Sequence, residues 1–440
     1  MSAQNNPQPS GGRTLDPWYS NYAARTRGLS ASEVRALFAV ASRPEVVSLA
    51  GGSPFVAGLP DELVHAAFES MMREHGPDAL QYGGGQGLPQ LREQILELIA
   101  MEGITDANAD DIITTTGSQH AIDLVTKLFI DPGDVILVES PSYVGALGTF
   151  KSSEADIRHV DMDDEGLNLA GLTKAIHAAR AEGKSVKFLY TVPNYNNPTG
   201  VTMSASRRRE VLDLCIREDI LIVEDNPYGL LYFDSPAPDA IRSLDSEHVV
   251  YLGSFSKILS PGVRVGFVVA PHGIREKIVL SVESSILSPS MMNQWLVTEF
   301  LSGTDWRGQI DTFRGIYRER RDSMLDALQE HLPQLSWTNP DGGFFTWVQL
   351  PEGLDSKQML PRAVKELVAY TPGTGFYVDG RGRDKIRLSF SLPDPERIRL
   401  GVRRLANVVN EELDLLETFG EVATPTRPER HVSAAPPDLV

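Results

Sequence analysis

Lys257 lies between two apolar runs of strand length, and its position is the first sign of chemistry in the chain. The segment 249–267 reads VVYLGSFSKILSPGVRVGF, so small hydroxylated residues precede the lysine and Pro261, Gly262 and Arg264 follow it. An ammonium group beside buried strands is costly, because burial favours the neutral amine. A neutral amine can form a Schiff base with a carbonyl compound. The segment therefore predicts a lysine that binds an aldehyde covalently; a solvated loop lysine is the alternative.

A second group of residues suits an anion. The run DIITTT ends in Gly117-Ser118-Gln119, and a helical pattern follows at once. The first N–H groups of a helix are free and the helix dipole favours negative charge, so phosphate binds well at such a place. Arg264 is a further candidate, because guanidinium binds phosphate through two hydrogen bonds. An ordinary N-cap by Ser118 is the alternative for this segment.

Three further strand-like runs end in polar or aromatic residues. DVILVES leads to Tyr143, VKFLYTVP leads to a turn that contains Asn197, and ILIVED ends at Asp225, with Tyr228 three residues on. In an open parallel sheet, ligands bind at the carboxyl ends of the strands. One molecule could satisfy all these residues. It would carry an aromatic ring for Tyr143, a basic nitrogen for Asp225, an aldehyde for Lys257 and a phosphate for the helix that starts at Ser118. The sequence therefore predicts pyridoxal 5′-phosphate as the cofactor.

The elements that position these residues alternate along the chain. Strand-like runs and amphipathic helical stretches follow one another, which predicts an α/β fold with a mainly parallel sheet between helices. After residue 305 a long helical stretch, two strand-like runs and a closing helix predict a smaller α+β domain. We expect disordered tails at 1–15 and 420–440, an N-terminal segment at 16–50, a large domain at 51–305 and a small domain at 306–419.

The composition limits the partners and the location. Lys and Arg number 41 against 59 Asp and Glu, a formal net charge of −18 over 440 residues, which argues against nucleic acid or an anionic membrane as a partner. The single cysteine, Cys215, excludes a disulfide within the chain and fits a cytoplasmic location. No apolar run reaches the length of a membrane span, and the N-terminus lacks a signal-peptide core. We therefore expect a cytoplasmic protein with small-molecule partners.

Taken in order, the motifs resemble those of a known family. The chain is similar to the fold type I pyridoxal-phosphate enzymes of the class I and II aminotransferases, nearest to the aminoadipate, kynurenine and broad-specificity branch. The similarity covers residues 25–415 and rests on the motifs AGGSPF (50–55), YGGGQGLPQLR (82–92), TTGSQHAIDLV (115–125), ESPSYVGAL (139–147), NNPTG (196–200), VEDNPY (223–228), SFSKILSPGVRVG (254–266) and IRLSFS (386–391). It implies a large domain with a sheet of the seven-stranded type, a small domain, and an N-terminal segment that covers the active site.

The resemblance also implies a role for each cofactor residue. Lys257 is the Schiff-base lysine and the general base, and Asp225 pairs with the pyridine N1–H. Asn197 and Tyr228 hydrogen-bond the phenolic oxygen, and Tyr143 stacks on the ring. The residues expected at the phosphate are Ser118, Gln119, Ser254, Ser256 and Arg264, together with Tyr82, which reaches the phosphate of the neighbouring subunit. A homodimer is therefore the expected functional unit.

The substrate site is expected at Arg387, Gly52 and Asn197. Arg387, in KIRLSF, matches the family's arginine that binds the substrate α-carboxylate through two hydrogen bonds. A strand-edge arginine exposed to water is the alternative for this residue. Because Arg387 belongs to the small domain and Lys257 to the large one, carboxylate binding should draw the two domains together.

The recognition of the substrate side chain is expected to depend on the N-terminal segment. In aminoadipate-type relatives an arginine of this segment meets a distal carboxylate. Alignment on ASEVRAL (31–37) puts Gly28 at that position, so Arg27 takes it only by a one-residue shift, and solvated Arg25 and Arg27 are the alternative. Aromatic residues near the expected site favour an apolar or aromatic donor: Phe55, Tyr143, Tyr195 and Phe376.

We therefore predict a pyridoxal-phosphate-dependent aminotransferase without a metal. It should move the amino group of an apolar, aromatic or aminoadipate-like L-amino acid to a 2-oxo acid, with 2-oxoglutarate as the acceptor, by a ping-pong mechanism. Another fold type I enzyme, such as a Cβ–S lyase or a decarboxylase, is the alternative within the same fold. The effector-sensing module of a transcription regulator is the alternative of a different class, disfavoured because only a short polar stretch precedes Trp18, with no basic DNA-binding domain.

Overall fold

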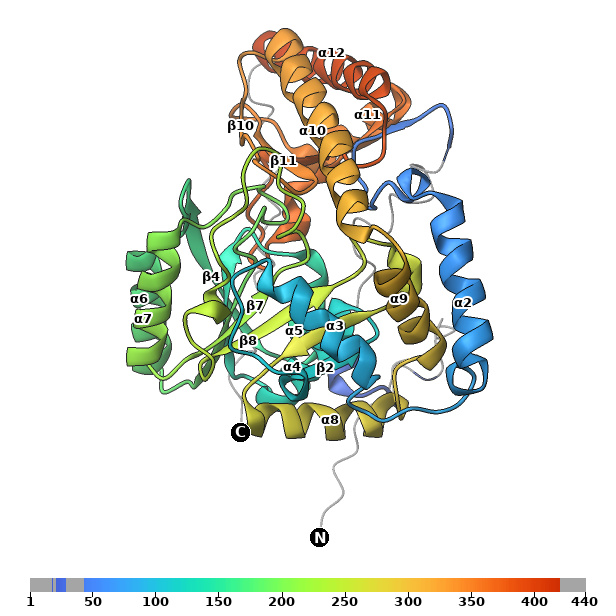
Figure 1. Ribbon diagram of the computed structural model, residues 1–440. Coiled ribbons are helices and arrows are strands. Elements are labelled where there is room, and N and C mark those ends of the chain that lie inside the picture. The colour runs from blue at the N-terminus through green and yellow to red at the C-terminus, as the bar shows by residue number, and fades with distance from the viewer. Residues whose placement is uncertain (1–17, 19–20, 29–42, 420–440) are drawn as a thin grey trace, which may run out of the picture.

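An eight-stranded sheet forms the centre of the protein, with the strand order β2-β9-β8-β7-β6-β3-β4-β5 (Figure 1). The computed structural model describes residues 18, 21–28 and 43–419. The strands are β2 (Ile112–Thr115), β3 (Val135–Ser140), β4 (Asp156–Asp163), β5 (Gly166–Leu167), β6 (Val186–Thr191), β7 (Leu221–Asp225), β8 (Val249–Ser254) and β9 (Gly266–Val269). Among these strands, β9 and the short β5 run against the direction of the others. The predicted α/β fold with a mainly parallel sheet is confirmed.

Helices cover both faces of this sheet (Figure 1). Helices α4 (Ser118–Phe129), α5 (Val144–Ser152) and α8 (His272–Ile286) pack on one face, and α6 (Leu169–Ala181) and α7 (Ala205–Arg217) pack on the other. Each helix buries residues three or four positions apart, such as Leu172, Ile176 and Ala179 of α6. A fully buried aliphatic side chain of this kind contributes about 1.5–3 kcal/mol to folding. These two cores hold the strand ends in place.

Helices α2 (Asp61–Ala79), α3 (Pro89–Ala100) and α9 (Met291–Gly303) form a further core on the face of the sheet opposite α4, α5 and α8, at its β2 end. They share a core with Ile112 of β2 and Val269 of β9. Short 3₁₀ helices occur at Ala24–Gly28 (η2), Val56–Gly58 (η3), Ala109–Asp111 (η4), Ile241–Ser243 (η5), Pro261–Val263 (η6) and Gly373–Phe376 (η7). Within the described residues, no helix is both long and apolar enough to cross a membrane.

The C-terminal part of the chain builds a second sheet, with the order β10-β11-β14-β13. Its strands are β10 (Ser336–Trp337), β11 (Phe345–Gln349), β13 (Thr371–Pro372) and β14 (Lys385–Ser389). The same part of the chain contains helices α10 (Trp306–His331), α11 (Ser356–Lys365) and α12 (Pro395–Phe419). Helix α10 begins near α9 and extends to the far end of the molecule (Figure 1). The N-terminal strand β1 (Val47–Ser48) pairs with β12 (Val368–Ala369).

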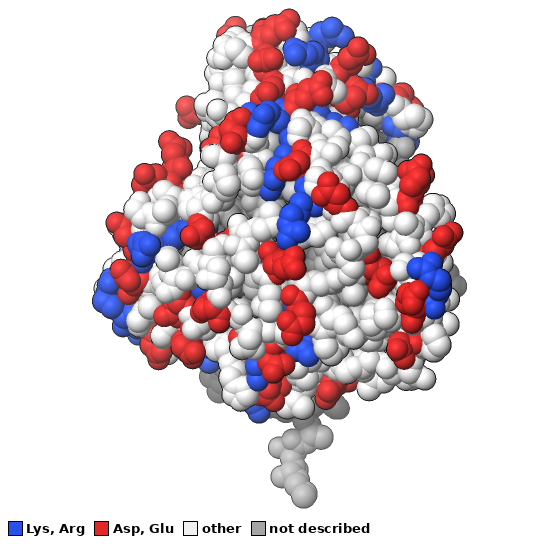
Figure 2. Space-filling view, in the orientation of Figure 1, with Lys and Arg blue, Asp and Glu red and all other residues white. Residues whose placement is uncertain are grey.

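The predicted domain limits stay predictions. The limit at residues 305 and 306 falls between α9 and α10, and the pairing of β1 with β12 brings part of the segment 16–50 to the C-terminal part. Both predicted tails lie outside the described residues. On the face shown in Figure 2, acidic side chains are spread over the surface with basic side chains among them, as the net charge of −18 suggests.

Candidate active site

Most of the predicted site residues line one pocket of about 350 Å³ at the carboxyl ends of the parallel strands. Asp225 is the last residue of β7, Asn197 follows β6, Tyr143 follows β3 and Ser118 follows β2. Lys257 follows β8. The predicted residues that line the pocket are Gly52, Ser118, Tyr143, Asn197, Asp225, Tyr228, Lys257 and Arg387. The topology thus brings together residues that are far apart in the sequence.

Lys257 carries an amine with a lowered pKa. Its Nζ donates a hydrogen bond to the carbonyl oxygen of Gly52 at 3.1 Å, and it lies 5.8 Å from the ring centre of Phe344. Desolvation, together with the positive charges of Arg387 and Arg264, lowers the pKa of Lys257 to about 8, although Asp225 acts in the opposite sense. A useful fraction of the side chain is therefore a neutral, nucleophilic amine near neutral pH.

Asp225 is a buried carboxylate with one open oxygen. The Tyr190 hydroxyl donates to Oδ2 at 2.7 Å, whereas Oδ1 has no hydrogen-bond partner among the described residues. Burial raises the pKa of Asp225 to about 6, while the Tyr190 hydrogen bond and the Lys257 charge favour the ionised form. A buried carboxylate oxygen without a donor is unfavourable. The open oxygen therefore suits a cationic N–H donor such as a pyridinium nitrogen.

Ser118 at the start of α4 lines the pocket, and Arg264 lies beside it, outside the lining. Because β9 runs against β2, with Thr115 paired to Gly266, Arg264 lies beside the loop that precedes α4. Its Nη2 donates to the Thr116 carbonyl at 2.8 Å. Gly117 has a φ of 91°, and a Cβ there would lie 2.8 Å from the Arg264 guanidinium, so only glycine fits. The start of the helix and an arginine are thus brought together, as the sequence predicts for a phosphate.

The other predicted phosphate residues take part in local contacts. Gln119 donates to the Thr149 hydroxyl at 2.8 Å and to the Gly145 carbonyl at 3.2 Å. The Ser256 N–H donates to the Ser254 hydroxyl at 3.1 Å, which shapes the loop before Lys257. These three side chains do not line the pocket itself. Their contact with the phosphate stays a prediction.

Arg387 of β14 is buried at the opposite side of the pocket. Its Nη1 donates to Asn197 Oδ1 at 2.8 Å, and its Nη2 donates to the Ala50 carbonyl at 2.6 Å and to the Thr371 hydroxyl at 3.4 Å. Burial lowers the pKa of Arg387 to about 10, although the group stays charged near neutral pH. Its Nε has no hydrogen-bond partner among the described residues. All its hydrogen-bond partners there are neutral, so a carboxylate ligand would supply the missing negative charge.

Two aromatic rings enclose the Arg387 guanidinium. Its central carbon lies 4.1 Å from the ring centre of Phe345 and 5.0 Å from that of Phe376. Such cation–π contacts stabilise a guanidinium that has lost its water. Gly52 accommodates the Phe345 ring, because a Cβ at this position would lie 2.6 Å from it. The exposed alternative for Arg387 is therefore wrong.

Tyr228 completes the pocket wall near Asn197. Its ring packs edge-on against Phe344 and Phe345, with centroids 5.3 and 6.0 Å away. Burial raises the pKa of Tyr228, while Arg387 and the neighbouring Asn197 favour the anion. The hydroxyl is therefore protonated near neutral pH and can donate a hydrogen bond.

Three residues that the sequence analysis considered are not among the described residues that line the pocket: Tyr82, Arg25 and Arg27. Tyr82 is 78% exposed, so within one subunit it does not contact the site. Arg25 lines a separate hollow with Lys127 and Glu154, beside the ends of α4 and α5. The side chain of Arg27 lies outside the described residues. The roles of Tyr82 and Arg27 stay predictions.

Tyr190 and Phe345 are the site residues that the sequence did not reveal. Both lie in strands whose residues are buried, so an aromatic residue there is read as core. The Tyr190 hydroxyl, in the mainly apolar run VKFLYTVP, was the available signal, because a buried hydroxyl needs a partner. No comparable signal marks Phe345.

The polar atoms of the pocket fit pyridoxal phosphate. Oδ1 of Asp225 lacks a donor, Lys257 offers an amine with a lowered pKa, and Arg264 lies beside the start of α4. The family model for aminotransferase class I and II matches residues 45–405. The chain belongs to this family. The predicted enzyme class, fold type and cofactor are thereby confirmed: the protein is an amino-acid aminotransferase that uses pyridoxal phosphate.

Known relatives agree with this conclusion. The chain is 40% identical over 404 residues to aromatic-amino-acid aminotransferase 1 of Thermococcus litoralis, covering 91% of this chain and 96% of that one. The crystal structure of kynurenine aminotransferase from Pyrococcus horikoshii matches with a TM-score of 0.87 and 38% identity, covering 91% and 99%. That of the α-aminoadipate aminotransferase LysN from Thermus thermophilus, complexed with N-(5′-phosphopyridoxyl)-L-leucine, matches with a TM-score of 0.83 and 34% identity, covering 90% and 99%.

Proposed function

We propose that this aminotransferase takes the amino group from an apolar or aromatic L-amino acid and passes it to a 2-oxo acid, with 2-oxoglutarate as the acceptor. The observation that supports the choice of donor is the charge of the pocket. Among the described residues that line it, the charged side chains are Asp225, Lys257 and Arg387. Each has a task at the cofactor or at the α-carboxylate, so none of the described lining residues offers a further cation to a distal carboxylate such as that of 2-aminoadipate.

The residues of the pocket divide the chemistry between them. Bound pyridoxal phosphate supplies the electrophilic carbon and the electron sink. Lys257 accepts a proton at Nζ from the substrate Cα and returns it, because its lowered pKa leaves part of the amine neutral. Asp225 holds an N–H donor at Oδ1 while Tyr190 fixes Oδ2. The Nε–H of Arg387 has no hydrogen-bond partner among the described residues and is free to bind the substrate carboxylate.

A panel of donors tests the choice of substrate. The holoenzyme is mixed with leucine, phenylalanine, kynurenine, glutamate and 2-aminoadipate in separate half-reactions, and the 2-oxo acid product is identified. We expect phenylalanine or leucine to exceed 2-aminoadipate by about tenfold or more in kcat/KM, because a distal carboxylate would be desolvated without a partner. A preference for 2-aminoadipate would contradict the proposal. Carbon dioxide with the matching amine as the main product would point to a decarboxylase.

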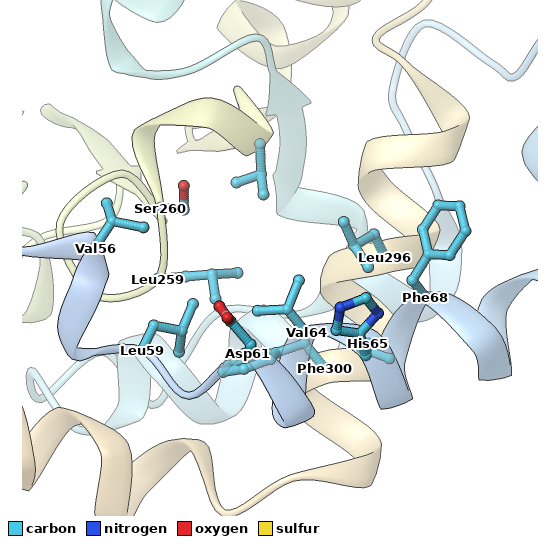
Figure 3. Close-up of a pocket in the computed structure, with 12 residues that line it drawn as sticks. Val56, Leu59, Asp61, Val64, His65, Phe68, Leu259, Ser260, Leu296 and Phe300 are labelled. Atoms are coloured by element: carbon cyan, nitrogen blue, oxygen red, sulfur yellow. The ribbon is translucent and has the colours of Figure 1, made fainter.

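We also propose that the functional unit is a homodimer formed through α2. Large apolar side chains are exposed along this helix and just beyond it: Phe68, Met72, Leu80 and Tyr82. A hollow of about 390 Å³ lies at the start of α2, and Figure 3 shows Val64, His65 and Phe68 of α2 around it with Leu296 of α9 and Leu259 of the Lys257 loop. An apolar surface of this kind favours contact with a second copy. In such a dimer Tyr82 would reach the phosphate of the neighbouring subunit.

A cytoplasmic location is also proposed. It rests on the single cysteine, Cys215, which is buried in α7.

A further inference from the structure

Glu139 is a fully buried carboxylate at the end of β3, beside the active site but outside its lining. Three donors converge on it. Its Oε2 accepts hydrogen bonds from the Val192 N–H at 3.0 Å and from Asn196 Nδ2 at 2.7 Å, and its Oε1 accepts one from the Thr191 hydroxyl. A buried carboxylate is costly to fold around, so these contacts are the features that make it tolerable there.

Asn196, which Glu139 holds, organises the turn that follows β6. Its Oδ1 accepts hydrogen bonds from the Thr199 N–H at 3.1 Å and from the Thr199 hydroxyl at 3.0 Å. Its carbonyl accepts from the Gly200 N–H at 2.7 Å. The amide of Asn196 therefore joins the end of β3 on one side to the turn 196–200 on the other.

The next residue, Asn197, belongs to the substrate site. Its Oδ1 accepts the hydrogen bond from Arg387 Nη1 at 2.8 Å. The turn also abuts the second sheet, because the Thr338 hydroxyl donates to the Thr199 carbonyl and a Cβ at Gly200 would lie 2.6 Å from the Phe345 carbonyl. A shift of the turn would thus move the acceptor that orients the Arg387 guanidinium.

We propose that Glu139 is a positioning residue for the reaction: it holds Asn196, and thereby fixes Asn197 against Arg387 at the site for the substrate α-carboxylate. This inference rests on the proposed role of Arg387. In this role Glu139 is required because it accepts hydrogen bonds, and its negative charge is not required. Burial raises the pKa of Glu139 to about 7, so a protonated side chain, which can donate to the Thr191 hydroxyl and still accept at Oε2, is accessible near neutral pH.

Two substitutions of Glu139 distinguish the effect of losing its hydrogen-bond acceptor from the effect of losing its negative charge. In E139Q the amide oxygen can accept from the Val192 N–H and from Asn196 Nδ2, and the amide nitrogen can donate to the Thr191 hydroxyl. In E139L a side chain of similar size offers no acceptor. E224L is the matched control, because Glu224 is equally buried and accepts from the Ile241 and Arg242 N–H groups, both at 2.9 Å, away from the turn.

The readout is the dissociation constant of the holoenzyme for 3-phenylpropionate, a carboxylate that cannot react, measured by calorimetry together with the affinity for pyridoxal phosphate. We expect E139L to bind 3-phenylpropionate about tenfold or more weakly, with E139Q and E224L within about threefold of the parent and cofactor affinity little changed in all three. Unchanged binding by E139L, a loss in E139Q equal to that in E139L, or an equal loss in E224L would overturn the proposal.

Two further variants keep the test decisive if E139L does not fold. N196D replaces the donated N–H by a carboxylate oxygen facing Glu139 and should weaken 3-phenylpropionate binding about tenfold. Unchanged binding by N196D would overturn the proposal. R387A is measured in parallel: unchanged binding in R387A would refute the role of Arg387 itself, whereas a loss in R387A with none in E139L would refute only the role of Glu139.

Discussion

Arg387 donates from Nη1 to the side-chain oxygen of Asn197 at 2.8 Å, although 190 residues separate the two in the chain. Arg387 belongs to the sheet of the C-terminal part, and Asn197 belongs to the turn after β6 of the central sheet. Their hydrogen bond therefore joins the two parts of the chain at the pocket, which both residues line. A ligand that binds Arg387 is placed by both parts of the chain at once, which is the arrangement that domain closure on a substrate requires.

The first prediction concerns Arg387 itself. Replacing it by alanine should raise the KM for the amino acid roughly 100-fold, because a charge-assisted, two-point contact with the carboxylate is lost. The affinity for pyridoxal phosphate should change by less than about threefold, since the hydrogen bonds of Arg387 go to Asn197, Ala50 and Thr371 and not to the residues predicted at the phosphate. Steady-state kinetics and a cofactor titration measure the two. The control is R399A, because Arg399 is exposed and its Asp326 contact is long, at 3.5 Å. Equal losses of substrate and cofactor affinity would contradict the assigned role.

The second prediction concerns the cost of keeping Asp225 buried. Its pKa is about 6 in the folded chain without cofactor, against an ordinary value of 3.8, so the folded state binds more protons than the unfolded state between these values. Stability contributed by this group is therefore lost as the pH rises. Cofactor-free D225N should gain in unfolding free energy relative to the parent by about 1 kcal/mol between pH 5 and pH 8, by the linkage relation.

Urea unfolding of both cofactor-free proteins at the two pH values measures this difference. The same variant should bind pyridoxal phosphate about tenfold or more weakly, because the carboxylate that would hold the pyridinium N–H is gone. A stability difference that does not change with pH, or an unchanged cofactor affinity, would count against the role of Asp225.

The third prediction follows from the lowered pKa of Lys257. Only the neutral amine attacks an aldehyde, and its pKa is about 8 instead of the ordinary 10.5. The rate at which the cofactor-free protein captures pyridoxal phosphate should rise about tenfold per pH unit below pH 7 and level off above pH 8.5. Stopped-flow absorbance follows the reaction, with a simple alkylamine as the control for the pH dependence of the aldehyde. A rate still rising tenfold per unit above pH 9 would show an unperturbed lysine.

The fourth prediction concerns the dimer. F68K should shift the protein towards the monomer, because it places a charge on the exposed apolar surface of α2. L415K is the matched control, since Leu415 is exposed to a similar degree, 39% against 46% for Phe68, but lies on α12 of the C-terminal part. Sedimentation velocity at several concentrations measures the association. A shift in L415K with none in F68K would place the interface elsewhere.

The sequence was sufficient for the residues that stand at strand ends. Lys257, Asp225, Asn197 and Tyr143 each follow an apolar run, and in a parallel sheet such positions meet at one edge regardless of how far apart they are in the chain. Gly117, directly before Ser118, likewise indicated from the sequence where helix α4 begins. Local pattern and topology therefore agree at these positions.

The sequence was insufficient where a role depends on a contact within the core. Glu139 lies in the motif that carries Tyr143, but its link to Asn196 spans 57 residues and exists only because β3 and β6 are neighbours. Tyr190 and Phe345 have the residue types of ordinary buried strands. Residues that support a site from within the core carry no local signal, because burial and hydrogen bonding are set by the tertiary structure.

The identity of the lysine is the claim on which the rest depends. The protein is loaded with pyridoxal phosphate, reduced with borohydride, digested and analysed by peptide mass mapping, with K257A treated in the same way. We predict a single phosphopyridoxyl group, on the peptide that contains Lys257, and none in the variant. A phosphopyridoxyl group on another lysine, or no modification in the parent protein, would contradict the assignment of the pocket.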